Sequence, residues 1–165
     1  MYTIEEEEGH VLKVTGISYL NEENKIVLDN GTIDFMKPVT SDYAFMFDFK
    51  FNNDNPNRNT GFTFNPFKSY YFDKPWTSNG DILRVSIRQL SYKLTHRIDG
   101  FVNYPIDKIF SNSLPSNEWL TFMCKLSLGK ISFKVWNKNQ PNIVYIDEVY
   151  KTSHITSKTL IAPKL

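Results

Sequence analysis

The sequence predicts an all-β fold, a two-sheet antiparallel β-sandwich or jelly roll, and three observations support this prediction. Apolar and polar residues alternate over many short segments, which is the period of a strand with one buried face. No window of a dozen residues sustains a helical stripe, and strands do not alternate with helices. Clusters of Gly, Pro and Asn separate the segments as turns. The 165 residues predict a single domain over 1–165, with its core over about 10–150.

Apolar and polar residues alternate in three segments of the first 52 residues. "VLKVTGISYL" from Val11 predicts a strand. "KIVLDNGTIDF" (residues 25–35) predicts a hairpin, because Asn30 and Gly31 both tolerate the positive φ of a tight turn. "YAFMFDFKFN" predicts the clearest strand of the chain, with five aromatic side chains on one face: Tyr43, Phe45, Phe47, Phe49 and Phe51.

The second half of the chain continues the alternation. "DILRVSIRQL" and "YKLTHRID" predict strands whose inner faces carry Leu83, Val85 and Ile87, then Tyr92, Leu94, His96 and Ile98. "WLTFMCKLSL" and "ISFKV" predict two neighbouring strands joined by a turn at Gly129. "IVYIDEVYK" from Ile143 predicts another strand, whereas "YPIDKIFSNSL" (residues 104–114) has room for one helical turn.

Charge and apolar content exclude several classes of protein. The net charge of +1 argues against a nucleic-acid binder, which needs a concentrated basic face. No apolar run approaches the ~20 residues that a membrane helix requires, so we expect no membrane insertion. Cys124 is the only cysteine, so it forms no internal disulfide, and its apolar surroundings predict a buried thiol.

Catalytic and metal-binding patterns are missing from the sequence. A retaining glycanase needs two carboxylates on one face about 5–5.5 Å apart, whereas Asp147 and Glu148 are adjacent in a strand and point to opposite faces. His10, His96 and His154 lack the spacing of zinc ligands. We therefore expect neither an enzyme nor a cofactor. A calcium ion at "NNDNPNRNTG" stays open as an alternative, although Asp54 is its only carboxylate.

The stretch "NEWLTFMCKLSLGKISFKVWNKNQP" resembles the penultimate hairpin of concanavalin A-like, laminin-G-like jelly rolls. The resemblance depends on Asn117, Trp119, Gly129 and the pair Trp136-Asn137. "SDYAFMFDFKF" resembles the strand that gives such domains their aromatic inner face, and "TGFTFNP" resembles its adjoining partner strand. The resemblance implies that Trp119 packs at the edge of the sandwich and that the Gly129 turn joins neighbouring strands.

Proteins of this fold include carbohydrate-binding modules, some glycanases, protein-binding laminin-G modules, and modules of phage baseplate and tail proteins. With catalytic carboxylates missing, the resemblance implies a non-catalytic carbohydrate-binding module for a cell-surface or cell-wall saccharide, in a phage host-attachment apparatus. The chain is then extracellular or virion-associated, with a polysaccharide and other chains of a larger assembly as partners. The alternative is a laminin-G-like protein-interaction or structural module, because a fold alone does not fix function.

Two places offer the aromatic rings and planar polar groups that sugars need. The first is the loop "NPFKSYYFDKPWTSNGD". The alternative for this loop is that its aromatic rings cap one end of the sandwich and bind no sugar. The second is an outer sheet face, provided that its strands are neighbours; the alternative is a solvated face with weak ion pairs. The candidate carbohydrate-binding residues are Tyr70, Tyr71, Asp73 and Trp76 in the loop, and Asp48, Arg84, Arg88 and Trp136 on the outer face.

Overall fold

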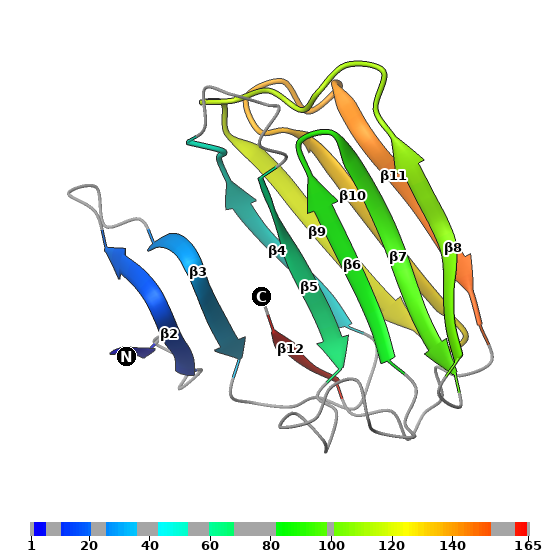
Figure 1. The fold of residues 1–165 in the computed structure, drawn as a ribbon, viewed down its shortest axis with the longest axis horizontal. Helices are drawn as coiled ribbons and strands as arrows, with labels where there is room; N and C mark the ends of the chain where they lie inside the picture. Colours follow the sequence, from blue (N-terminus) through cyan, green and yellow to red (C-terminus); the bar gives the residue numbers. More distant parts are fainter. Residues whose placement is uncertain are drawn as a thin grey trace.

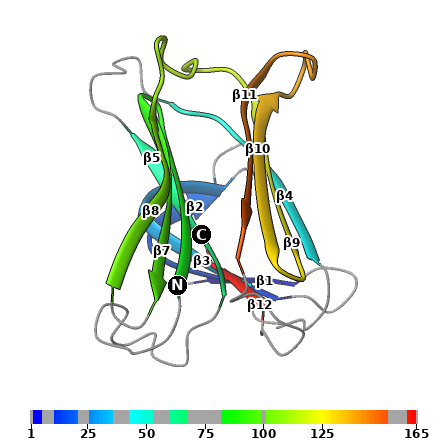
Figure 2. The same cartoon turned by 90° about the vertical axis from the view of Figure 1, so that its right-hand side faces the viewer.

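The protein is a sandwich of two antiparallel sheets that face each other across a buried core (Figures 1 and 2). This computed structural model describes residues 2–5, 11–20, 26–35, 43–52, 60–67, 82–98, 101–152 and 161–164. No helix occurs in these ranges, and thus none long and apolar enough to cross a membrane. The strands are β1 (Tyr2–Glu5), β2 (Val11–Leu20), β3 (Ile26–Phe35), β4 (Tyr43–Phe49), β5 (Gly61–Phe67), β6 (Ile82–Arg88), β7 (Ser91–Ile98), β8 (Phe101–Ile109), β9 (Leu120–Ser127), β10 (Lys130–Asn137), β11 (Val144–Lys151) and β12 (Ile161–Lys164).

The larger sheet has eight strands in the order β1-β2-β3-β12-β5-β6-β7-β8. The strand β12, which is last in the sequence, lies between β3 and β5 and pairs with both. The strands β5 to β8 are neighbours in the sheet in the same order as in the sequence. They form the part of the larger sheet that faces the smaller sheet (Figure 2).

The smaller sheet has four strands in the order β11-β10-β9-β4. The hairpin of β9 and β10 is its centre, and Lys130 pairs with Ser127 across the turn. Gly129 in this turn has a φ of 72°, a conformation in which a Cβ would be strained. The predicted junction of neighbouring strands at Gly129 is therefore confirmed.

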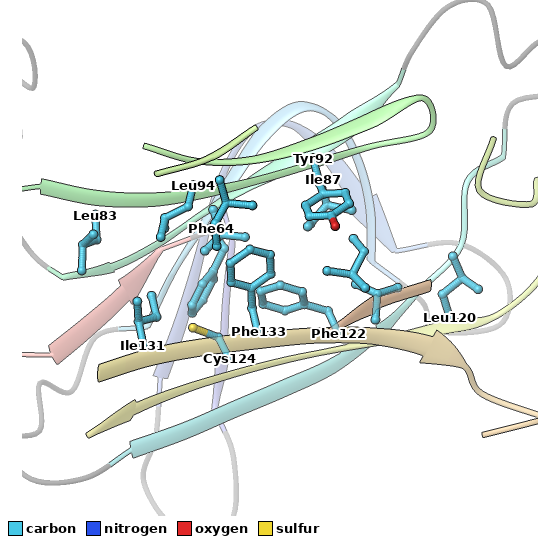
Figure 3. Close-up of a cluster of buried hydrophobic side chains, with 14 of the residues drawn as sticks. Phe64, Leu83, Ile87, Tyr92, Leu94, Leu120, Phe122, Cys124, Ile131 and Phe133 are labelled. Atoms are coloured by element: carbon cyan, nitrogen blue, oxygen red, sulfur yellow. The ribbon is translucent and has the colours of Figure 1, made fainter. Parts of the chain in front are cut away.

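Alternating side chains of both sheets meet to form the core (Figure 3). Phe64 from the larger sheet and Phe122 from the smaller sheet have exposed fractions of only 1% and 0%, and their ring centroids lie 5.4 Å apart. The predicted inner faces are confirmed for the side chains that the structure describes, whereas the side chain of Ile98 lies outside that description. The following residues predicted to point inward are buried: Leu83, Val85, Ile87, Tyr92, Leu94, His96, Phe122, Cys124, Ile131, Phe133 and Val135.

The aromatic strand β4 forms one margin of this core. Phe45 stacks on Phe64 with 5.1 Å between centroids, and Phe47 meets Phe62 edge-on at 5.3 Å. Both contacts cross from β4 to β5, so β5 faces β4 from the opposite sheet. The prediction that "TGFTFNP" is the adjoining partner of β4 is therefore wrong; the partner of β4 is β9, which follows it by some seventy residues.

β8 and β11 are end strands of the two sheets (Figure 2). Polar side chains of β7, β8 and β11 join the sheets on this side. The Tyr92 hydroxyl donates to Glu148 Oε1 at 2.7 Å, and Lys108 Nζ contacts the same oxygen. Burial, together with Glu148, raises the pKa of Tyr92 to about 12. His96 Nδ1 lies 3.0 Å from the Tyr150 hydroxyl as a second link between β7 and β11. We call the group of Tyr92, Lys108 and Glu148 the polar bridge.

Two further predictions are corrected by the strands. The predicted hairpin at 25–35 is wrong, because β3 runs through Asn30 and Gly31 as one strand with an irregular register against β2. A residue pair that permits positive φ fits a β-bulge as well as a turn. The prediction of a helical turn within residues 104–114 is also wrong, because residues 104–109 belong to strand β8. Pro105 is tolerated there because β8 is an end strand with a register shift beside it.

Candidate functional site

The outer face of the larger sheet carries a cluster of planar polar side chains, which we call the arginine row: Asn65 on β5, Arg84 on β6, and Thr95 and Arg97 on β7. Each of these residues alternates with residues that are buried in the core, such as Val85 and Leu94. Because successive strand side chains point to opposite faces, the row lies on the side away from the smaller sheet.

The register of the strands sets the geometry of the arginine row. Arg84 is directly opposite Thr95, and Arg97 is opposite Ile82. Arg97 is thus a diagonal neighbour of Arg84, at a spacing of roughly 7–8 Å. Arg84 Nε donates to Asn65 Oδ1 at 3.1 Å, which orients the guanidinium plane on the sheet. The row therefore combines fork-shaped donors with an amide and a hydroxyl.

The arginine row is shielded from water although it faces away from the core. Thr95 and Arg97 are each only 8% exposed. Burial lowers the pKa of Arg84 from its ordinary value, because the charged form loses hydration. Electrostatic interactions and hydrogen bonds are stronger in such surroundings than in bulk water. The polar contacts of these side chains are therefore stronger than they would be in bulk water.

The arginine row lies where the chain leaves and re-enters the larger sheet around residues 68–81. β5 ends at Phe67, two positions beyond Asn65, and β6 begins at Ile82, two positions before Arg84. The candidate residues Tyr70, Tyr71, Asp73 and Trp76 lie between these two anchors, outside the described residues. Their role in sugar binding stays a prediction.

Arg88 extends the same outer face toward the other end of β6. It is exposed and pairs with Gly61 of β5. A Cβ at Gly61 would lie 2.1 Å from the carbonyl oxygen of Ile87, so only glycine allows this close approach of β5 and β6. Arg88 is four positions after Arg84 in β6, which places the two residues about 13 Å apart along the strand.

The other predicted outer-face residues lie on the smaller sheet. Asp48 of β4 is opposite Thr121 of β9, which is opposite Trp136 of β10. These three residues form one row across the outer face of that sheet. Trp136 is half-buried there, with Lys134 Nζ 5.8 Å from the ring centroid.

Asp48 already has a structural role in this row. Its Oδ1 accepts from the Thr121 hydroxyl at 2.7 Å, and its Oδ2 lies 2.8 Å from Lys138 Nζ. Lys138 Nζ is 5.7 Å from the centroid of the Trp119 ring, and Lys50 Nζ is 5.0 Å from it. Asp48 thus helps to hold a cation against Trp119 at the margin of the smaller sheet.

The predicted arrangement in which Trp136 and the arginines line one surface does not form. Arg84 and Arg88 are in the larger sheet, whereas Asp48 and Trp136 are in the smaller one. Facing sheets pack about 10 Å apart, and the two groups point outward from opposite sides of the sandwich. One sugar residue cannot contact both.

The metal-binding predictions concern the His, Cys, Asp and Glu side chains of the chain. No group of three or more His, Cys, Asp or Glu side chains in them is placed to hold a metal ion. Asp54, the carboxylate of the alternative calcium site, lies outside these ranges. Cys124 is 1% exposed, and burial raises the pKa of its thiol to about 12, so the prediction of a core cysteine is confirmed.

The sequence prediction missed Asn65, Thr95 and Arg97 as candidate site residues. Alternation placed Thr95 and Arg97 on an outer face, but it did not align that face with Arg84. The signal that could have done so is the short connection between Arg88 and Ser91, because two residues between alternating segments are typical of a hairpin.

Comparison with known proteins agrees with the architecture. No family model matches the sequence, and no curated protein matches it. The basic winged bean lectin, solved with Tn-antigen, superposes with a TM-score of 0.64 at 11% identity, covering 93% of this chain and 80% of the lectin. Lectin I from Ulex europaeus, solved with the methyl glycoside of α-L-fucose, gives 0.58 at 11% identity, covering 97% and 86%. The carbohydrate-binding module CBM66 from Bacillus subtilis gives 0.56 at 12% identity, covering 93% and 86%. This chain therefore has the concanavalin A-like jelly-roll fold that the lectins and the module share.

Proposed function

We propose that the chain is a non-catalytic carbohydrate-binding module that binds a saccharide on the outer face of its larger sheet. One observation carries the proposal: the guanidinium of Arg84, oriented by Asn65, lies beside Thr95 and Arg97 at the end of the sheet where residues 68–81 depart. Sugar hydroxyls both donate and accept, so they suit a site that presents amide, hydroxyl and guanidinium groups side by side.

The aromatic residues between β5 and β6 would supply the second requirement of such a site. A pyranose presents an apolar face of C–H groups, which packs on an aromatic ring. Tyr70, Tyr71 and Trp76 belong to the segment anchored next to the arginine row. The lectins and the carbohydrate-binding module that share the fold add support, although their sequence identity is low.

The proposal includes a setting for this saccharide. We assign it to a cell surface or bacterial cell wall, and the chain to an extracellular or virion-associated position in a phage host-attachment apparatus. The β9–β10 hairpin resembles that of concanavalin A-like jelly rolls, and modules of this fold also occur in phage baseplate and tail proteins, which supports this setting. Retention of the purified protein on insoluble cell walls, and release by soluble wall polysaccharide, is the expected result; equal retention on washed cellulose would contradict it.

Tryptophan fluorescence provides the test of binding and of its location. The protein is titrated with purified cell-wall polysaccharide fragments, alongside the variants Trp76→Ala and Trp136→Ala. Trp76 belongs to the sequence that connects β5 and β6, outside the described residues, and Trp136 lies on the outer face of the smaller sheet. We expect a saturable shift that Trp76→Ala abolishes and that Trp136→Ala preserves.

The other outcomes are equally informative. Loss of the shift only in Trp136→Ala would move the site to the row of Asp48, Thr121 and Trp136. Binding that is unaffected by Arg84→Ala would contradict the arginine row as the contact surface. Calorimetric silence across a broad panel of wall and cell-surface glycans would contradict the carbohydrate-binding function itself.

A laminin-G-like protein-interaction or structural role is the second candidate, and exposed apolar side chains on β8 favour it. Phe101 is 76% exposed, Tyr104 is 55% exposed and Ile109 is 84% exposed. Large exposed apolar groups can mark protein interfaces, and these three are distributed along the length of β8. A partner that co-purifies with the protein and is lost in Phe101→Ser with Ile109→Ser, while saccharide titrations stay silent, would favour this role.

A further inference from the structure

We propose that the outer face of the smaller sheet docks on an anionic lipid bilayer through a lysine cluster near the turn between β9 and β10. The lysine cluster consists of Lys125 on β9, Lys130 and Lys134 on β10, and Lys151 on β11. It is separate from the arginine row, so the inference goes beyond the proposed saccharide binding and does not depend on it.

The register of the strands brings these lysines together. Lys130 is directly opposite Lys151 across the β10–β11 pair. Lys125 is opposite Ser132, which lies between Lys130 and Lys134, so Lys125 is a diagonal neighbour of both at roughly 7–8 Å. All members of the cluster occupy positions that alternate with inward-facing residues of their strands, so they point away from the core.

The cluster has a surplus of positive charge. In strands β4, β9, β10 and β11, the carboxylates on this outer face are Asp48 and Asp147. Asp48 is paired with Lys138, and Asp147 lies opposite Lys134. The other three lysines of the cluster are exposed, and in the part of the chain that the structure describes none of them forms an ion pair. This face therefore attracts anions.

The placement of Lys130 against Lys151 disfavours the folded state. Like charges directly opposite each other in a sheet destabilise the pair of strands. The strands stay paired beside them, because the Thr152 N–H group donates to the Gly129 carbonyl oxygen at 2.9 Å. A local conflict of this kind is expected at a functional surface, and an anionic partner laid against both lysines would relieve it.

Apolar side chains accompany the lysines. Leu128, in the turn two positions before Lys130, is 72% exposed, and Val149, opposite Ser132, is 56% exposed. The headgroup region of a bilayer accepts this mixture, because lysine stems lie along apolar surface while their ammonium groups reach phosphate oxygens. Such docking is peripheral and involves no spanning segment.

The chemistry of lysine favours a lipid surface over other anionic partners. Protein interfaces are depleted in lysine, and an oxyanion held in one fixed geometry is better matched by the guanidinium fork. Ammonium groups on flexible stems suit a fluid layer of headgroups. A soluble polyanion would offer no apolar layer to Leu128 and Val149. With this face on a bilayer, the outer face of the larger sheet points away from it (Figure 2).

Co-sedimentation with lipid vesicles tests the docking. Vesicles of phosphatidylcholine alone are compared with vesicles of equal parts phosphatidylcholine and phosphatidylglycerol. We expect binding to the anionic vesicles to be at least about tenfold stronger than to the neutral ones. Raising the salt from about 0.1 M to about 1 M shortens the screening length from about 10 Å to about 3 Å and should abolish most of this difference.

Variants locate the binding surface. Lys151→Gln should weaken binding to the anionic vesicles about fivefold, and it should raise the urea midpoint because the repulsion from Lys130 is gone. Leu128→Ser should weaken binding without changing its dependence on salt. The matched control is Lys93→Gln, which makes the same charge change on the larger sheet and should bind vesicles like the unchanged protein.

Each contrary outcome has a distinct meaning. Equal binding to neutral and anionic vesicles would overturn docking by charge, and equal loss in Lys93→Gln and Lys151→Gln would overturn the lysine cluster as the surface. A lowered urea midpoint in Lys151→Gln would contradict the repulsion. Binding to a soluble glycerol-phosphate polymer but not to vesicles would replace the bilayer by a polymer as the partner. Saccharide titrations of Arg84→Ala concern the other sheet, so the proposed function stands or falls separately.

Discussion

Replacing Glu148 by Gln tests whether the polar bridge stabilises the packing of the two sheets. The change keeps the size of the side chain and its acceptor oxygen but removes the charge that Tyr92 and Lys108 contact. A hydrogen bond to a charged group contributes about 1.5–3 kcal/mol, and one between neutral groups about 0.5–1.5 kcal/mol. We therefore expect Glu148→Gln to lower the free energy of unfolding by about 1 kcal/mol.

Urea denaturation near neutral pH, followed by tryptophan fluorescence, measures this loss. The matched control is Asp147→Asn, which makes the same chemical change one residue away on the exposed outer face. A surface change of this kind should alter the stability by less than about 0.5 kcal/mol. If the two variants are equally stable, the polar bridge contributes nothing and the reasoning fails.

The pH dependence of the same pair provides a second test. Burial alone would raise the pKa of the Glu148 carboxyl, but hydrogen bonds from Lys108 and Tyr92 outweigh it and hold the pKa below its ordinary value of 4.5. A lowered pKa in the folded state means stabilisation that is present above 4.5 and lost as the pH falls through the folded-state value. The stability difference between the unchanged protein and Glu148→Gln should shrink in acid, and a constant difference down to about pH 3 would contradict this cause.

Three further predictions concern the core and its turn. Phe122→Ala removes a ring that is 0% exposed, so urea denaturation should show a loss of about 3–5 kcal/mol; a loss below about 1 kcal/mol would mean that the ring is not in the core. Gly129→Ala strains a residue with a φ of 72° and should cost about 1–2 kcal/mol, whereas Leu128→Ala in the same turn should cost less than about 0.5 kcal/mol. The Cys124 thiol, whose pKa burial raises to about 12, should react with iodoacetamide near neutral pH only after denaturation. Rapid mass-spectrometric labelling of the native protein would refute that prediction.

The faces of single strands could be predicted because the side-chain period is a local property of the sequence. Leu83, Val85 and Ile87 of β6 are buried as predicted, and Arg84, between the first two, points outward. The Gly129 turn was predictable for the same reason, because its conformation depends on neighbouring residues alone.

The partner of each strand could not be predicted in this way, because pairing joins segments that are distant in sequence. Alternation says which side chains of β4 face inward but not that β4 pairs with β9 while β5 belongs to the other sheet. For this reason the sequence left open whether Trp136 and Arg84 lie on neighbouring strands, and the structure places them in different sheets. Asn30 and Gly31 illustrate the same limit. Pairing with β2 holds them in the middle of strand β3, so they do not form a hairpin turn.

The end strand β8 bears on how the protein behaves at high concentration. A long uninterrupted end strand offers a row of backbone donors and acceptors on which another chain can add, which begins aggregation. In β8 the proline at 105 lacks an N–H group, and the extra residue beside it breaks the regular spacing of the remaining groups. β8 is thereby a poor template for a growing fibril, and a single Pro105→Val change would restore the N–H donor that is missing at this position.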